Sequence, residues 1–179
     1  ELISGKTPLT GDYQTRNLVT LFQIFENLKV KFDLSEKNFI RGVEEVLSVT
    51  GLQGRWQVIG EKPLTICDTG HNKEGLEYVT RQLQMLDYRK LHIVIGFVSD
   101  KDISNLLPLF PRDAQYYFTK ASVQRALDEK ILKKKALAIG LNGNSFSTVQ
   151  AALNDARKNS GTDDVIFIGG STFVVAEVI

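Results

Sequence analysis

The apolar residues of this 179-residue chain follow two different patterns. In the first part they recur every three to four residues, which predicts amphipathic helices. The first helix begins near Gln14 and carries on one face Leu18, Leu21, Phe22, Phe25 and Leu28. A second helix begins at Ser35, a residue type that favours helix N-caps, and carries on one face Phe39, Ile40, Val43 and Leu47. Both helices need another surface against which to bury these side chains.

After a polar, glycine-punctuated segment at residues 50–56, short apolar runs alternate with helical stretches. Apolar runs rich in β-branched residues predict strands, here at residues 63–68, 90–98, 114–120 and 163–170. Helical spacing predicts helices at residues 73–86, 102–110 with an interruption near Pro108, 122–137 as one or two helices, 148–158, and from Thr172 onward. Residues 140–147 are rich in glycine and asparagine and predict a loop.

Strands separated by single helices favour right-handed crossovers and therefore a mostly parallel sheet. We predict an α/β, Rossmann-like domain over residues 51–179, with helices on both faces of the sheet, preceded by two helices within residues 1–50. Ligands in such sheets bind beyond the carboxyl ends of the strands. This rule singles out the strand exits at residues 68–71, 96–100, 119–121 and 169–171.

Composition and charge exclude several classes of function. The chain has 22 basic and 21 acidic residues, a balance that argues against duplex nucleic acid or an anionic membrane as partner. Cys67 is the only cysteine, so an internal disulfide and a cysteine-based metal site are excluded. With no signal peptide and no apolar stretch that could span a bilayer, we expect a cytoplasmic protein. Because the chain begins at Glu1 and ends in an uncapped apolar segment, we expect it to be part of a longer protein.

The sharpest candidate site is the segment CDTGHNKEG at residues 67–75, between a predicted strand and a predicted helix. Asp68 presents carboxylate oxygens that can bind ribose hydroxyls or a magnesium shell. His71 and Asn72 lie at the N-terminus of the next helix, where backbone amides and the helix dipole favour an anion. The residues alone leave open the alternative that Asp68 and Asn72 are only caps and that His71 is incidental.

Two further candidates lie elsewhere in the chain. The guanidinium group of Arg55 can clamp a phosphate, and Gly170 with Ser171 can hold a carboxylate on backbone amides and a hydroxyl. Arg55 could equally be a surface residue and Ser171 a simple cap. His92 lies within a strand, which favours a core position over a catalytic one. The chain contains neither a GxxxxGK[ST] phosphate loop nor a G-x-S-x-G elbow.

Taken in order, five segments resemble the C-terminal part of the folylpolyglutamate synthase/dihydrofolate synthase family, which belongs to the Mur ligase superfamily. They are GLQGRWQVI, a strand ending in DTGHN, IGFVSDKD, FTKASVQRAL and GGSTFVVAEV. The helix start GDYQTRN resembles the end of the central ATPase domain of that family. The resemblance implies that residues 1–50 are the tail of the ATPase domain with a linker, and that residues 51–179 form the glutamate-ligase domain.

The reaction that the resemblance implies is ATP-dependent amide bond formation. ATP phosphorylates a carboxylate of a pterin or folate, and the amine of L-glutamate then attacks the acyl phosphate, with Mg²⁺ neutralising charge on the phosphates. The family's active sites lie between a P-loop ATPase domain and the C-terminal domain. We therefore expect the upstream ATPase domain as partner, no metal ligand within this chain, a monomer, and neither nucleic-acid nor membrane binding. Alone, the chain is expected to be inactive and to bind ATP weakly.

The resemblance also implies roles for individual residues on the nucleotide side. Arg55 is expected to contact the ATP phosphates, Asp68 to bind the nucleotide at its ribose, and Asn72 to support the same loop. His71 and Asp68 are the expected catalytic residues, with His71 near the phosphates or the incoming glutamate.

On the glutamate side, the resemblance implies a pocket formed by His71, Gly170 and Ser171, with Ser171 holding a carboxylate. The sequence departs from the family pattern in two places: the first bears on the path of the loop, and the second removes a possible hydroxyl contact. The family loop commonly reads Asp-Gly-Ala-His-Asn-Pro, whereas residues 68–73 read Asp-Thr-Gly-His-Asn-Lys. Phe173 stands where many relatives have a tyrosine.

Three alternatives compete with this interpretation. A free-standing Rossmann-type nucleotide-binding module would carry G-x-G-x-x-G after the first strand, and the chain has none there. A cell-wall Mur ligase shares the C-terminal fold but usually carries a lysine-bearing loop at this strand end. A non-catalytic scaffold would require five coincidences in order. Whether the intact enzyme makes dihydrofolate, lengthens polyglutamate tails, or does both depends on a pterin pocket that lies largely upstream.

Overall fold

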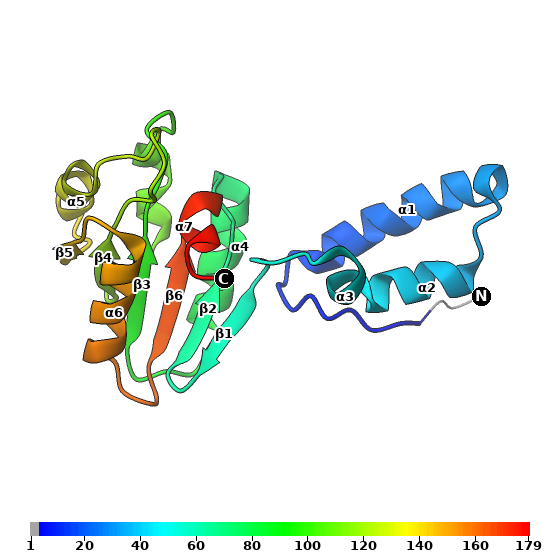
Figure 1. Ribbon diagram of the computed structural model, residues 1–179, viewed down its shortest axis with the longest axis horizontal. Helices are drawn as coiled ribbons and strands as arrows, with labels where there is room; N and C mark the ends of the chain where they lie inside the picture. Colours follow the sequence, from blue (N-terminus) through cyan, green and yellow to red (C-terminus); the bar gives the residue numbers. More distant parts are fainter. Residues whose placement is uncertain (1–3) are drawn as a thin grey trace.

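The computed structural model describes residues 4–179, in which a helical N-terminal part precedes an α/β body (Figure 1). The helical part consists of α1 (Gln14–Phe32), α2 (Glu36–Glu44) and α3 (Val46–Thr50), and it projects away from the sheet.

Ser35 caps α2 as predicted, because its hydroxyl oxygen accepts a hydrogen bond from the Asn38 amide at 3.2 Å. The predicted second helix is shorter than expected, since the backbone breaks at Glu45 and Leu47 lies on α3. Residues 1–3 of the predicted part at residues 1–50 lie outside the described residues.

One six-stranded sheet forms the centre of the α/β body, with the strand order β1-β2-β6-β3-β4-β5. The strands are β1 (Gln57–Glu61), β2 (Leu64–Cys67), β3 (Leu91–Ile95), β4 (Gln115–Phe118), β5 (Gly143–Ser145) and β6 (Val165–Gly169). Neighbouring strands pair in parallel, except that β1 runs antiparallel to β2. The predicted α/β class and mostly parallel sheet are therefore confirmed. The last strand in sequence, β6, lies between β2 and β3.

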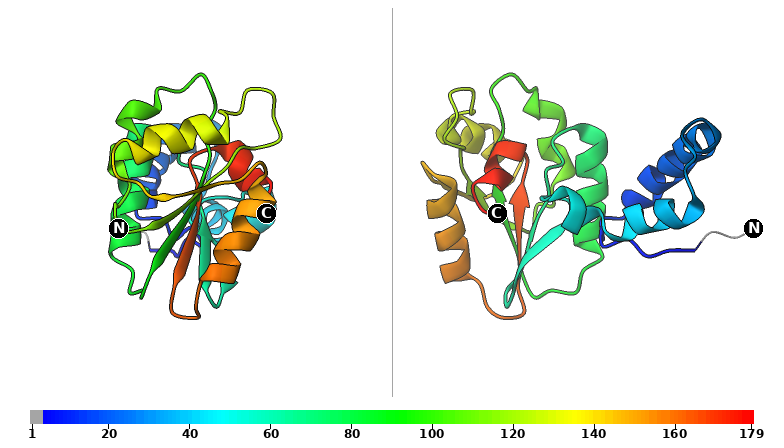
Figure 2. Two further views of the ribbon diagram at one scale, coloured as in Figure 1. Left: turned by 90° about the vertical axis from the view of Figure 1, so that its left-hand side faces the viewer. Right: turned by 45° about the vertical axis from the view of Figure 1, so that its right-hand side comes forward.

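Helices cover both faces of this sheet, as predicted (Figure 2). Side chains alternate along β3, so Ile93 and Ile95 join one core cluster and Val94 joins the other. The first face is covered by α4 (Lys73–Gln84), α5 (Glu129–Leu137) and two 3₁₀ turns, η1 (Ile103–Asn105) and η2 (Leu107–Leu109). The second face is covered by α6 (Val149–Asn159) and α7 (Thr172–Ala176). Within residues 4–179, no helix has both the length and the apolar character needed to cross a membrane.

Two predicted helical segments are wrong in detail. Residues 102–110 form η1 and η2 in place of an interrupted helix, because Pro108 at the start of η2 has no N–H to continue a helical ladder. Of residues 122–137, only α5 is helical. The preceding residues pair with the segment after β3 instead: the Ser99 amide donates to the Arg125 carbonyl at 2.8 Å, and the Leu127 amide donates to the Phe97 carbonyl at 2.9 Å.

Two edge strands were not predicted. Residues 143–145, expected as a loop, form β5, and residues 57–61 form β1. β5 contains no apolar residue and is held by backbone pairing with β4. Gly143 permits this close approach, because a Cβ atom there would collide with the carbonyl oxygen of Tyr116. Neither strand carries the apolar run by which a strand is recognised in a sequence.

A buried polar cluster lies toward the amino ends of β3 and β6. His92 is fully buried, consistent with the predicted core position, and its Nδ1 lies 3.0 Å from the hydroxyl oxygen of Tyr117. Its Nε2 lies 3.3 Å from Oδ2 of Asp164, which also accepts hydrogen bonds from Arg89 and from the Gly161 amide. Burial lowers the pKa of His92, although Asp164 opposes the shift. Burial raises the pKa of Asp164, but its hydrogen bonds outweigh this and the pKa is lowered.

We predict that this cluster makes the protein less stable at mildly acidic pH. The pKa of His92 in the folded state lies below the unfolded value of about 6.5, so the unfolded chain takes up a proton first as the pH falls. The free energy of unfolding therefore decreases below about pH 6.5, and urea unfolding across this range measures the decrease. The variant His92→Gln should flatten the profile.

The matched control is His71→Gln, which removes the other, exposed histidine and should leave the profile unchanged. If His92→Gln kept the slope of the unsubstituted chain, other groups would be responsible for the pH dependence.

Candidate functional site

The carboxyl ends of β2, β6 and β3 bring three distant segments of the chain together. Backbone hydrogen bonds continue beyond the strands, with the Asp68 amide donating to the Ile168 carbonyl at 3.1 Å. The Gly96 amide likewise donates to the Gly169 carbonyl at 3.4 Å. The loops that follow these three strands therefore meet at one edge of the sheet, where ligands of parallel α/β proteins bind.

Asp68 is buried at this edge, with only 1% of its surface exposed. Its Oδ2 accepts hydrogen bonds from the Tyr13 hydroxyl at 2.7 Å and from the Trp56 amide at 2.7 Å. Its Oδ1 accepts a hydrogen bond from the Gly70 amide at 2.7 Å. Burial raises the pKa of Asp68, while these donors and the charge of Arg55 act to lower it. One carboxylate thus joins the start of α1, the loop before β1 and the exit of β2.

A pocket of about 520 Å³ lies beside Asp68. All three residues predicted to bind ATP line this nucleotide-side pocket, namely Arg55, Asp68 and Asn72. His71 lines it as well. The structure therefore brings this set together, although Arg55 is separated from the others by two strands in the sequence.

A second pocket, of about 430 Å³, lies at the exit of β6. It is lined by all three residues predicted for glutamate binding, namely His71, Gly170 and Ser171. His71 is thus common to both pockets. The side chain of His71 is exposed, and its Nδ1 lies 3.0 Å from the carbonyl oxygen of Thr69. Because a carbonyl oxygen only accepts, Nδ1 carries the proton in this contact and Nε2 is left for a ligand.

Asn72 and Ser171 also cap helices, so the capping alternative from the sequence describes part of their role. The Asn72 side chain accepts a hydrogen bond from the Gly75 amide at 2.8 Å at the start of α4. The Ser171 hydroxyl accepts one from the Phe173 amide at 3.2 Å at the start of α7. Each side chain retains a donor beyond the cap: the amide NH₂ group of Asn72 and the hydroxyl proton of Ser171.

Gly170 has a structural reason to be glycine. Its φ angle of 87° lies in the left-handed region, and a Cβ atom there would come within 2.9 Å of the Gly96 carbonyl oxygen. A larger residue would therefore push the β6 exit away from the β3 exit.

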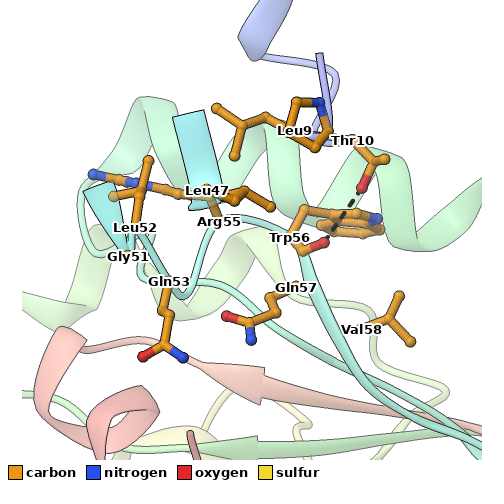
Figure 3. Close-up of a pocket in the computed structure, with 11 residues that line it drawn as sticks. Leu9, Thr10, Leu47, Gly51, Leu52, Gln53, Arg55, Trp56, Gln57 and Val58 are labelled. Atoms are coloured by element: carbon orange, nitrogen blue, oxygen red, sulfur yellow. Dashed lines mark hydrogen bonds between the residues drawn. The ribbon is translucent and has the colours of Figure 1, made fainter. Parts of the chain in front are cut away.

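Arg55 and Trp56 extend in opposite directions from the loop before β1 (Figure 3). Trp56 lies near Thr10, whose hydroxyl donates to the Trp56 carbonyl at 3.4 Å. Arg55 lines both the nucleotide-side pocket and the 460 Å³ pocket drawn in Figure 3. Among residues 4–179, no carboxylate lies within ion-pair distance of Arg55. Its guanidinium group can therefore bind an anionic ligand without first breaking an ion pair of this part of the chain.

Several residues that line the two pockets were not among those singled out from the sequence. Gln14 and Asn17, in the first turns of α1, line the nucleotide-side pocket, and Nδ2 of Asn17 donates to Oε1 of Gln14 at 2.8 Å. Lys101 and Arg125 line the second pocket. Gln14 and Asn17 are far in sequence from the predicted strand exits, whereas Lys101 directly follows the predicted exit at residues 96–100. Within the described residues, no group of three His, Cys, Asp or Glu side chains could hold a metal ion.

Comparison with known proteins gives a consistent family relationship. Residues 54–172 match the family model described as Mur ligase, glutamate ligase domain. A probable bifunctional folylpolyglutamate synthase/dihydropteroate synthase of Haloferax volcanii is 32% identical over 180 residues. The match covers 99% of this chain but 20% of that protein, so the chain spans about a fifth of the length of this relative.

Two solved structures match the fold at a similar level. A bifunctional folylpolyglutamate synthase/dihydrofolate synthase from Yersinia pestis, complexed with AMPPNP and Mn, has a TM-score of 0.67 and 28% identity. A structure of a bifunctional folylpolyglutamate synthase/dihydrofolate synthase with Mn, AMPPNP and L-glutamate bound has a TM-score of 0.66 and 31% identity. Each match covers 81% of this chain and 34% of the other.

We predict that Asp68→Ala destabilises the fold strongly. The change leaves two backbone amides and one phenol near this buried position without their acceptor, which costs about 2–4 kcal/mol in the free energy of unfolding. Denaturant unfolding measures the loss. Asp87→Ala is the control, because that aspartate is exposed and should change stability by less than about 0.5 kcal/mol. Equal effects of the two substitutions would contradict a structural role for Asp68.

Proposed function

Because the chain belongs to the Mur ligase family, through its glutamate ligase domain, we propose that it is the C-terminal part of an ATP-dependent ligase. The reaction joins L-glutamate to dihydropteroate, to folates or to both. One observation supports this most directly: the residues expected to bind the nucleotide and those expected to bind glutamate line two pockets that share His71. Two substrates could therefore meet at this side chain.

The proposed reaction has two steps. The γ-phosphoryl group of ATP passes to a carboxylate oxygen of the pterin or folate substrate, which releases ADP and leaves an acyl phosphate. The amine of L-glutamate then attacks the acyl carbon, loses a proton, and displaces inorganic phosphate as the amide forms. Bound Mg²⁺ would neutralise charge on the phosphates. The related structures that contain AMPPNP and Mn support the use of a nucleotide with a divalent metal.

On the nucleotide side, we assign the phosphates to Arg55 and the ribose to Asp68. Arg55 is exposed and carries a permanent charge, which suits it to phosphate oxygens. Asp68 lines the same pocket and can accept hydrogen bonds from hydroxyl groups. Asn72 supports the loop that follows Asp68 through its cap on α4.

On the glutamate side, we assign one carboxylate of L-glutamate to the Ser171 hydroxyl and the backbone at Gly170. The same pocket is lined by Lys101, Arg125 and Asp100, with Arg125 4.0 Å from the Asp100 carboxylate. These three side chains leave an excess of one positive charge, which favours an anionic substrate such as L-glutamate. His71 lies between the pockets, where Nε2 can interact with the group being transferred or with the incoming amine.

We propose that residues 1–50 are the tail of the central ATPase domain and that residues 51–179 form the ligase domain. Large apolar side chains are exposed on the helical part, including Val19 at 67%, Val30 at 89% and Phe32 at 58%. Exposed apolar surface of this kind marks an interaction site. We propose that the upstream P-loop ATPase domain of the same chain covers it. The phosphate loop and the metal ligands would then lie in that domain. The chain alone should therefore be inactive as a ligase and bind ATP weakly, and we expect the intact enzyme to be a monomer.

We predict that His71→Ala in the intact enzyme lowers kcat by about 100-fold or more, in line with the loss of a positioned imidazole. Stability should change by less than about 0.5 kcal/mol, because the side chain is exposed. A coupled ADP-release assay measures turnover. The control is Gln84→Ala, at an exposed position on α4 away from both pockets. Unchanged turnover in His71→Ala would contradict the proposed function.

We also predict that substitutions in the two pockets separate the two substrates. Arg55→Gln should raise the KM for ATP by about 10- to 100-fold, since hydrogen bonds to charged groups are worth about 1.5–3 kcal/mol, and leave the KM for L-glutamate near its original value. Ser171→Ala should raise the KM for L-glutamate and leave that for ATP unchanged. Steady-state kinetics with each substrate varied in turn measures both. The assignment fails if the two variants impair the same substrate.

A further inference from the structure

The carboxylate that the proposed function assigns to a ribose already has a hydroxyl bound to it. Oδ2 of Asp68 accepts a hydrogen bond from the Tyr13 phenol at 2.7 Å, and Tyr13 lines the nucleotide-side pocket together with Asp68. Only 1% of the Asp68 surface is exposed, so the carboxylate has no open side for another hydroxyl group. A ribose can reach it only if one of its present donors leaves.

Of the three donors, the phenol is the one that can leave. The Gly70 amide belongs to the turn that follows β2, and the Trp56 amide directly precedes β1, which pairs with β2. Both amides are therefore held by the sheet that also holds Asp68. The Tyr13 hydroxyl is at the end of a side chain from residues 1–50 and is separated from Asp68 by 55 positions in the sequence. Rotation of this side chain breaks the contact without disturbing the sheet.

We propose that Tyr13 is an internal substitute for a ribose hydroxyl, and that a ribose hydroxyl of the bound nucleotide displaces it from Asp68. The phenol and a ribose hydroxyl offer the carboxylate the same group, a single O–H donor, so the exchange leaves the buried charge with three donors. Burial and the neighbouring carboxylate raise the pKa of Tyr13, so the phenol keeps its proton and remains a donor. The inference rests on the proposed nucleotide site and adds a residue that sets its affinity.

Neighbouring contacts would keep the backbone around Tyr13 in place while a ribose hydroxyl replaces the phenol at Asp68. The side chain of Gln82 on α4 binds the segment that precedes α1: its Oε1 accepts from the Asp12 amide at 2.9 Å, and its Nε2 donates to the Thr10 carbonyl at 3.1 Å. The ring of Tyr13 packs edge-to-face against Tyr78, with the ring centroids 6.5 Å apart. Only the hydroxyl group of Tyr13 competes with the nucleotide, so Tyr13→Phe removes the competitor and keeps the aromatic ring.

The test compares the binding of ADP and 2′,3′-dideoxy-ADP to the intact enzyme by calorimetry. Loss of one hydrogen bond that must be broken on binding should make Tyr13→Phe bind ADP about 3- to 10-fold more tightly. Dideoxy-ADP has no ribose hydroxyl to replace the phenol, so its affinity should be the same in both proteins. Tyr88→Phe is the control, because this tyrosine lines neither the nucleotide-side pocket nor the second pocket, and it should leave both affinities unchanged.

Unchanged or weaker ADP binding by Tyr13→Phe would overturn this inference alone. An equal gain for dideoxy-ADP would do the same, because the phenol would then not be competing with the ribose hydroxyls. If neither the unsubstituted enzyme nor the variant bound ADP, the proposed nucleotide site would fail, and this inference with it.

Discussion

The carboxylate of Asp68 is the interaction on which the arrangement of the site depends. A buried charge is costly unless it is fully hydrogen-bonded, and Asp68 meets this requirement with donors from the start of α1, the loop before β1 and the exit of β2. These donors fix the loop that carries Arg55 and the turn that carries His71. The bond from the Tyr13 hydroxyl also connects the start of α1 to the exit of β2, so one side chain links the local geometry of the site to the helical part.

The position of β6 explains why two pockets lie side by side. As the last strand in sequence, it inserts between β2 and β3 and places the Gly170–Ser171 turn next to the loop after β2. Gly170 allows this close contact through its left-handed backbone. Two adjacent pockets therefore need no large insertion, because the strand order of the sheet brings the two loops together. His71, at the boundary, is placed by the cap that Asn72 forms on α4.

Much of this organisation could be predicted from the sequence, and the failures have physical causes. The central strands are apolar at nearly every position because both faces of the sheet are covered, so β3 and β6 were recognisable from their composition. β1 and β5 lie at the edges of the sheet and are held by backbone pairing, which leaves little trace in side-chain patterns. Residues 122–128 have helical spacing, but backbone pairing with the segment after β3 overrides that preference.

The sequence by itself determined the α/β class, the helices of residues 14–50 and the set of polar residues at the strand exits, because periodicity and strand ends are local properties of a chain. Only the tertiary structure decided which of these residues share a pocket, since this depends on the strand order and the insertion of β6. It also showed that Tyr13 binds Asp68. No local pattern could have indicated this contact, because the buried carboxylate takes its donor from a helix start 55 residues away.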